Sequence, residues 1–466
     1  MKRFTALVLC LAATGVAAAA PGSGKDAPVM LDVQPAAASV PVLKYQLLPE
    51  LAEMNPGNAV PAYLKCFAEQ NNFFFSKESV EEREKILSGP LSDIKPGSLK
   101  GYGGHALRQA DYAARLEYCD WNLLPQMREQ GYMLLIPEIQ QVRSLATALA
   151  VRCRGQIADK DYAGAAYTLK TIFALARHTG EHPTIISGLV GVAIAQMGCN
   201  QLQELIQQPD APNLYWALTD LPNPLVDNRR GVSADRMMST GTLSEVLDPK
   251  RPWGPEEVAG NVKKLTELGV MLAEIPDADR KPAEEWMKGR LKDEEWVAAA
   301  RKYLTDREYP ADAVGKYPAQ QVLFFKLYAK ARVRRDEALK WMNVPYWQAE
   351  EGFIEITKPP AEMEDKIAQV LVMAVPKVRT AHVRLEQRLA LLRVVEAIRL
   401  DAAKNGGKLP ASLSDLSVPV PADPVTGKPF AYKVDGMTAL LEGKETRTTG
   451  GTASTAHYRY EIRLRK

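Results

Sequence analysis

One short segment combines residue types and a spacing that could bind zinc. Residues 178–182, with His178, Glu181 and His182, fit the pattern H-x-x-E-H, in which two histidines bind zinc and the glutamate serves as general base. That hydrolytic chemistry needs both imidazoles on one helical face, about one turn apart. Gly180 lies inside the segment and Pro183 follows it, and both residue types are typical of a helix end. We therefore expect a polar corner between two helices, and the sequence assigns no metal ligand, cofactor or catalytic residue.

Other motifs that could support catalysis or phosphate binding are incomplete. The glycine-rich segment 101–105 has no strand before it and no Lys-Ser/Thr after it, so it predicts a turn before a helix rather than a phosphate-binding loop. No G-x-S-x-G motif occurs. His105, His382 and His457 each lack a nearby nucleophile in the sequence, although a triad could still assemble in space.

Acidic pairs could act as glycosidase carboxylates if two of them faced each other across a cleft. The candidates are Glu256-Glu257, Glu284-Glu285 and residues 293–295. They lie on expected amphipathic helices beside basic residues such as Lys288 and Arg290, which predicts solvated helix faces.

Composition and charge are those of an ordinary globular protein. Of 466 residues, 46% are hydrophobic and 25% are charged, and the formal net charge is +3. The densest basic cluster, Arg332, Arg334 and Arg335, is followed at once by Asp336 and Glu337, so it predicts a solvated helix face. We expect no nucleic-acid partner, since such a partner needs a basic domain or stripe.

The first twenty residues predict export. Lys2 and Arg3 form a basic start, residues 4–16 are almost wholly apolar, and residues 17–20 are small, which is the order found in a secretory signal peptide. The apolar run is shorter than the ~20 residues of a membrane span. We predict cleavage after Ala19 or Ala20 and a periplasmic location, with secretion as the alternative. Residues 21–44, rich in Pro, Ala, Gly and Ser over 21–41, predict a flexible linker.

The cysteines leave the redox state open. Cys10 lies in the predicted signal peptide, and Cys66, Cys119, Cys153 and Cys199 remain. Four cysteines in an oxidising compartment permit three pairings, but a chain of this length does not need disulfides to fold. Buried free thiols and disulfide bridges both fit the sequence.

From residue 45 to residue 376 the chain predicts helix after helix, arranged as an array of αα-hairpins. Apolar residues recur at helical spacing in consecutive helices beginning at Gln140, running over Tyr162–Arg177, and running from after Pro183 to about Gln207. Further helices are predicted over residues 256–274, 283–304 and 320–342. A regular repeat is not sustained, so a solenoid is not expected.

The third helix of that series carries small residues four apart. Ser187, Gly191, Ala195 and Cys199 form a stripe that lets a neighbouring helix approach closely. The apolar stretch 185–199 is short for a membrane span and contains Gln196. No transmembrane segment is predicted in the mature chain.

Residues 377–466 predict a small α+β module. A long helix over residues 379–404 is expected to pack Leu389, Leu392 and Val395 against an antiparallel meander. The strands are predicted at 430–434, 437–441 and 458–464, with Asp435-Gly436 as a hairpin turn. The buried face of that sheet is expected to carry Tyr432, Tyr460 and Ile462, and the loop 443–456 is expected to be exposed.

Two segments of this module resemble the globular part of type II secretion major pseudopilins. They are NGGKLPASLSDL at residues 405–416 and DPVTGKPFAYKV at residues 423–434, after a long helix. The resemblance covers about 60 residues and implies the shape of the module. The hydrophobic assembly helix of that family is absent from the start of this module, so filament assembly is not implied.

The whole chain also resembles a group of large secreted proteins from planctomycete-type bacteria. The resemblance is carried by residues 43–65, 113–123, 212–227 and 344–352. It implies a compartment and a lineage but no reaction. We therefore predict an exported, non-catalytic helical interaction or scaffold protein that binds other envelope proteins. The alternative is a hydrolase whose site assembles from distant residues, with zinc held through His178, Glu181 and His182.

Overall fold

The structure is a computed structural model of the whole chain. It describes residues 27–131, 134–241, 246–272, 277–307, 309–370, 374–447 and 458–465. The predicted signal peptide, His457 and residues 448–456 of the predicted loop lie outside the described residues.

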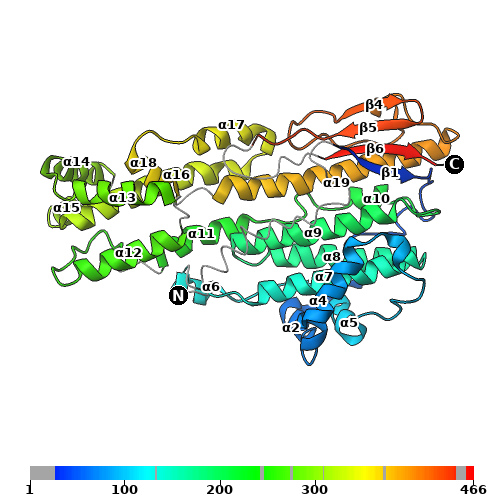
Figure 1. Cartoon of the computed structure of the whole chain (residues 1–466), viewed down its shortest axis with the longest axis horizontal. Helices are drawn as coiled ribbons and strands as arrows, with labels where there is room; N and C mark the ends of the chain where they lie inside the picture. The colour runs from blue at the N-terminus through cyan, green and yellow to red at the C-terminus, as the bar shows by residue number, and fades with distance from the viewer. Residues whose placement is uncertain are drawn as a thin grey trace.

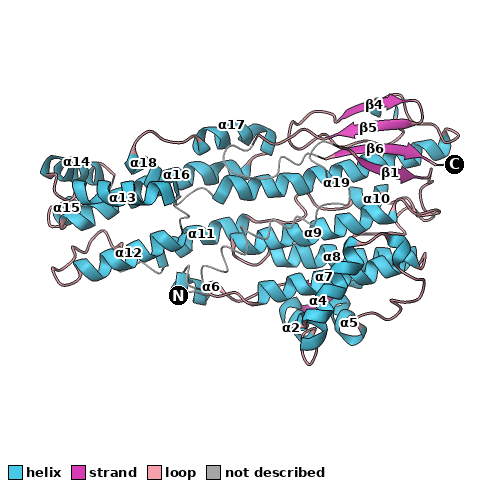
Figure 2. Ribbon diagram, viewed as in Figure 1, coloured by secondary structure: helices cyan, strands magenta, loops and turns pink. Residues whose placement is uncertain are grey.

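The molecule is elongated, with its long helices side by side along the longest axis and a small sheet near one end (Figure 1). Figure 2 shows that helices make up most of the chain, so the predicted mainly α fold with a small α+β part is confirmed. The α-helices are α2 (Ala59–Lys65), α3 (Asn71–Phe75), α4 (Lys77–Ser88), α5 (Gly104–Ala113), α6 (Leu124–Gln130), α7 (Glu138–Ala158), α8 (Tyr162–Gly180), α9 (Ile185–Leu205), α10 (Tyr215–Thr219), α11 (Arg229–Gly241), α12 (Val258–Leu272), α13 (Asp277–Arg290), α14 (Glu294–Thr305), α15 (Ala311–Val314), α16 (Ala319–Lys340), α17 (Tyr346–Thr357), α18 (Met363–Val370) and α19 (Ala374–Lys404). The 3-10 helices are η1 (Leu51–Glu53), η2 (Leu91–Asp93), η4 (Trp341–Asn343) and η5 (Leu413–Asp415). The strands are β1 (Val29–Val33), β2 (Asn55–Asn58), β3 (Leu116–Tyr118), β4 (Ala431–Asp435), β5 (Thr438–Glu442) and β6 (Arg459–Leu464).

Helices α7, α8 and α9 form the centre of the molecule, as the hairpin pattern predicts. Asp161 caps α8 by accepting a hydrogen bond from the backbone N–H of Gly164, and Thr184 caps α9 by accepting one from Ser187. The predicted small residues of α9 are all buried, and a Cβ atom on Gly191 would lie 2.7 Å from the carbonyl oxygen of Ala176 in α8. Glycine at position 191 therefore sets the close approach of α8 and α9.

Among the described residues, α9 alone has the length and apolar composition of a membrane-crossing helix. In the fold, 61% of that apolar window is buried inside the protein. A helix in the core of a globular domain can have the same composition, so the packing of α9 in this fold explains its apolar residues.

The sheet differs from the predicted meander at one edge. Its strand order is β1-β6-β5-β4, with β4, β5 and β6 antiparallel as predicted and β1 parallel to β6. Residues 29–33, expected to belong to a flexible linker, thus form an edge strand. The prediction was wrong there because the partner strand lies more than 400 residues along the chain. Leu31 and Val33 are fully buried, which stabilises the pairing.

Helix α19 lies between the sheet and helix α9 (Figure 1). Leu392 and Val395 are fully buried in the same hydrophobic core as Ile462, and Leu389 packs against that core half-buried. Of the side chains expected to face this layer, Tyr460 and Ile462 are buried, and Tyr432 is half-buried.

One core joins the two predicted domains. The core of α7–α9 continues into α19 and the sheet, so the boundary expected between residues 376 and 377 does not separate two cores. Glu396 and Arg399 of α19 form an ion pair at 2.6 Å whose side chains are both completely buried. Arg399 also donates to the carbonyl oxygens of Gln34 and Ala211, which fastens the N-terminal segment to α19.

The helix predicted over residues 283–304 is two helices. Helix α13 ends at Arg290 and α14 begins at Glu294, after Asp293 accepts a hydrogen bond from the backbone N–H of Trp296. The cap satisfies an otherwise free donor and starts a new helix, which apolar periodicity alone does not show. Helices α14, α15 and α16 pack around a second, smaller core that includes Trp253 and Phe325.

Candidate functional site

The predicted zinc motif lies at the corner between α8 and α9. His178 is in the last turn of α8, and its Nδ1 atom is 2.9 Å from the hydroxyl oxygen of Tyr63 in α2. Both side chains are buried. Burial, followed by the nearby charge of Arg177, lowers the pKa of His178 to about 4. The imidazole is therefore neutral at pH 7 and is held by a tyrosine.

His182 lies outside the helix, because α8 ends at Gly180 and Glu181 is its C-cap residue. Its Nδ1 atom is 2.8 Å from the hydroxyl of Ser187 and 3.2 Å from that of Thr184. Its side chain has no exposed surface, and burial lowers its pKa to about 4. Since His178 and His182 lie on different backbone elements and have different partners, the two imidazoles do not share the helical face that the zinc motif needs.

Glu181, the remaining member of the motif, is half-buried at the C-cap of α8. Burial raises the pKa of its carboxyl group, while Arg177 and Arg230 oppose that rise. The Arg177 Nε atom is 3.8 Å from the Glu181 carboxylate. Among the described residues, no group of three or more His, Cys, Asp or Glu side chains is placed to hold a metal ion. This segment is therefore the polar corner between two helices that the sequence predicts.

The other candidate catalytic residues of the sequence lie apart from one another in the structure. His105 is exposed at the start of α5, whereas His382 is buried in α19 with its Nδ1 atom 2.9 Å from the carbonyl oxygen of Val378. Glu284 and Glu285 are exposed on α13. Asp293, the cap of α14, pairs with Arg290 at 2.8 Å. Glu284 and Glu285 thus lie on a solvated helix face as predicted, whereas Asp293 is a helix cap and Glu256 and Glu257 lie in or beside the turn before α12.

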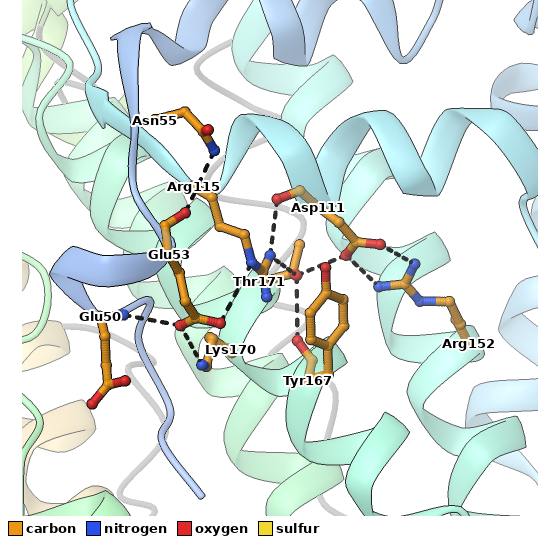
Figure 3. A network of polar contacts seen from close by, with 9 residues as sticks. All are labelled: Glu50, Glu53, Asn55, Asp111, Arg115, Arg152, Tyr167, Lys170 and Thr171. Atoms are coloured by element: carbon orange, nitrogen blue, oxygen red, sulfur yellow. Dashed lines mark hydrogen bonds and ion pairs between the residues drawn. The ribbon is translucent and has the colours of Figure 1, made fainter.

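A network of buried charges, which the sequence did not reveal, joins α5, α7 and α8 (Figure 3). The Asp111 carboxylate of α5 accepts two hydrogen bonds from the Arg152 guanidinium of α7, at 2.7 and 2.9 Å, and one from the Thr171 hydroxyl of α8, at 2.8 Å. Bidentate pairs of this kind fix orientation as well as contributing energy. Asp111 lies among the buried residues Leu107, Ala110 and Ala113 of α5. The one feature of the sequence that could have indicated this network is therefore a carboxylate, Asp111, on an apolar helix face.

Arg115 extends this network to the N-terminal segment. Its guanidinium donates to the carbonyl oxygen of Asp111 at 2.9 Å, lies 4.0 Å from the centre of the Tyr167 ring, and is 3.9 Å from the Glu53 carboxylate. Lys170 of α8 reaches the same carboxylate at 2.5 Å. Burial opposes ionisation of Glu53, but hydrogen bonds from Lys170 and from the Glu50 backbone outweigh it and lower its pKa. The network thus clamps η1 and α5 onto α8.

Exposed large apolar side chains are concentrated in this N-terminal region. Of the sixteen large apolar side chains that are exposed among the described residues, eleven belong to residues 40–135: Val40, Val42, Leu43, Leu51, Leu64, Phe75, Val80, Tyr112, Tyr118, Leu124 and Leu135. Leu64, Tyr112 and Tyr118 lie on α2, α5 and β3, and α2 packs against both α5 and β3. We call these three residues the N-terminal apolar surface. Exposed apolar side chains on adjoining elements are a candidate interaction site.

All four described cysteines are buried and free, which decides the alternative that the sequence left open. Burial raises the pKa of the Cys66 thiol to about 12 and that of Cys199 to about 11, and it also raises the pKa values of Cys119 and Cys153. Thiols that stay protonated and covered by protein are poor nucleophiles.

Comparisons with known proteins add no relative to these observations. No protein-family model matches the chain. No match was found among curated proteins or among solved structures.

Proposed function

We propose that this protein is an exported, non-catalytic helical interaction protein of the cell envelope that binds other envelope proteins through the N-terminal apolar surface. The observation that carries the proposal is the concentration of exposed apolar side chains in residues 40–135. Leu64, Tyr112 and Tyr118 are 43%, 50% and 51% exposed on adjoining elements. Two of the three are tyrosines, a residue type enriched in protein interfaces.

The backing of this surface supports the same function. Arg152 and Lys170 are held on α7 and α8, and their partners Asp111 and Glu53 hold α5 and η1 against those helices. A surface fastened in this way loses little conformational entropy when a partner binds. The Asp111 and Glu53 carboxylates are already paired with Arg152 and Lys170, so these charges serve to position a surface.

The binding claim is tested with a pair of matched double variants. Leu64→Ser with Tyr118→Ser removes apolar area from the surface, whereas Val333→Ser with Met437→Ser removes exposed apolar area elsewhere. We expect the first variant to lose binding to detergent-solubilised envelope proteins, free of lipid bilayer, in a quantitative pull-down, and the second to keep it. Equal retention by both variants would contradict the proposal, provided that circular dichroism shows both to be folded.

The claim of export is tested separately. The basic, apolar and small order of residues 1–20 supports cleavage after Ala19 or Ala20. Mass spectrometry of the mature N-terminus from cell fractions should find the shortened chain in the periplasmic fraction. An intact Met1 in the cytoplasm would contradict export.

The hydrolase alternative is tested by metal analysis of the purified protein. A metal site at this corner would bind zinc stoichiometrically and lose it in His178→Gln. Because His178 and His182 are held by Tyr63 and Ser187, we expect no such stoichiometric zinc. One zinc per chain that disappears in the variant would favour the enzyme.

A further inference from the structure

A second exposed apolar feature precedes the N-terminal apolar surface in the chain. Val40, Pro41, Val42 and Leu43 are four consecutive apolar residues, all exposed, and Val40 is 92% exposed. We call residues 40–43 the apolar turn. Consecutive exposed apolar residues are avoided in proteins unless they have a function.

The apolar turn is fixed at its base and projects from the fold. On one side the backbone N–H of Ala36 donates to the carbonyl oxygen of Arg399 at 3.0 Å. On the other side Gln46 and Leu47 are buried at 8% and 1% exposure. The turn therefore protrudes between two anchored ends, so its apolar side chains point away from the core that could have covered them.

The chemistry around the turn fits a lipid surface. Residues 33–49 contain one charged side chain, Lys44, and no acid. The Lys44 ammonium lies 5.4 Å from the centre of the Tyr45 ring, and lysine and tyrosine are residue types that favour the membrane–water interface. The cationic flank is complementary to anionic lipid headgroups.

The backbone of the turn is also suited to a medium without water. Pro41 has no N–H group, and the N–H of Lys44 donates to the Pro41 carbonyl oxygen at 3.0 Å. Two of the five amide positions from Val40 to Lys44 thus bring no free donor into the lipid. An unsatisfied donor that enters hydrocarbon is costly, so a turn is favoured over an open strand.

We infer that the apolar turn inserts into the outer layer of a lipid bilayer that contains anionic lipids, and so holds the protein on a membrane surface. The inference rests on the proposed function in one respect, since export would bring the chain to such a membrane. Four side chains give weak and reversible binding, because even a single myristoyl chain binds only marginally. The N-terminal apolar surface remains free for protein partners.

The test uses an environment-sensitive thiol dye at position 42. Because the four described cysteines are buried, Val42→Cys provides the reactive thiol, and Val333→Cys on α16 provides a matched exposed control. Vesicles of phosphatidylglycerol and phosphatidylethanolamine at about 1 mM lipid should shift the emission of the dye at position 42 to the blue. The dye at position 333 should not respond.

A second variant confirms that the apolar side chains are responsible. Val40→Ser with Leu43→Ser should lower the fraction of protein bound to these vesicles about tenfold or more. No emission change at position 42, or equal changes at positions 42 and 333, would overturn the inference. A response to a lipid-free partner protein but not to vesicles would also overturn it, while leaving the proposed function intact.

Discussion

The N-terminal region, residues 40–135, and the helical core of α7–α9 differ in how many large apolar side chains they expose. In the core, Val142, Leu149 and Ile172 are buried. In the N-terminal region, Asp111 and Arg115 are buried while tyrosines and leucines remain exposed. The core is stabilised mainly by apolar packing, with an ion pair between Arg154 of α7 and Glu204 of α9, whereas the N-terminal region is fastened to it by paired charges and presents more apolar area to the outside. This difference is the reason for proposing that the binding surface lies in the N-terminal region.

The largest effect is expected where the N-terminal charges are broken. Asp111→Ala leaves Arg152 without its carboxylate partner in a site where the two side chains are 13% and 11% exposed. We expect a loss of about 3–5 kcal/mol in the free energy of unfolding, because an uncompensated buried charge remains. Urea unfolding measures this loss, and limited proteolysis should cut residues 50–131 first.

The exposed pair Lys77–Glu81, at 3.7 Å, provides the control. Its Glu81→Ala variant should lose less than about 1 kcal/mol, since surface pairs are screened by water. Equal effects of Asp111→Ala and Glu81→Ala would show that the network does not hold the N-terminal region.

A smaller effect is expected from a single methyl group in the core. In Gly191→Ala the new Cβ atom would lie 2.7 Å from the Ala176 carbonyl oxygen, so α8 and α9 must separate. We expect a loss of about 1–3 kcal/mol in thermal or urea unfolding. Gly289→Ala, also helical but with open space around the new atom, should be neutral or stabilising by up to about 1 kcal/mol.

The sequence predicts the core better than the surface for a physical reason. Helices α7, α8 and α9 follow from spacings of three and four residues, and their predicted and observed ends differ by a few residues. Strand β1 was missed because five residues carry little periodic signal and their partner is β6, at the other end of the chain. The break between α13 and α14 depends on one cap, Asp293.

The candidate site shows the same limit. Gly180 and Pro183 correctly predicted that the helix would end at the zinc-like motif, because both act locally on the backbone. The network of Asp111, Arg115 and Glu53 joins segments up to 117 residues apart, such as Glu53 and Lys170. Local patterns do not specify such pairs, and exposure of the N-terminal apolar surface depends on how whole helices pack.

The corner between α8 and α9 predicts how stability depends on pH. The pKa values of His178 and His182 are lowered to about 4, so the folded state binds fewer protons than the unfolded state between about pH 6.5 and pH 4. The stabilisation is fully present above pH 6.5 and is lost as the pH falls. Each histidine should contribute a slope of up to about 1.4 kcal/mol per pH unit.

Urea unfolding between pH 4.5 and pH 7.5 measures this slope. His182→Gln should make it shallower, while His105→Gln, at an exposed position, should leave it unchanged. An unchanged slope in His182→Gln would show that the imidazole is not held neutral by burial.

Labelling with a thiol reagent, which changes no residue, tests the burial of the cysteines. Cys66, Cys119, Cys153 and Cys199 are free and buried, so a thiol reagent at pH 8 should label the native protein slowly at all four positions. In urea the same four positions should react completely. Labelling of fewer than four in urea without reductant would instead indicate a disulfide.

Site-specific photo-crosslinking in intact cells tests most directly whether the N-terminal apolar surface binds a partner. A photoreactive residue is placed at position 112 or 118 on that surface, and at position 333 or 437 as controls. All four positions are at least half exposed, so exposure alone does not separate them. We predict a discrete crosslinked protein from positions 112 and 118 and none from positions 333 and 437. Crosslinks of equal yield from all four positions, or none from positions 112 and 118, would contradict the assignment of this surface as the binding site.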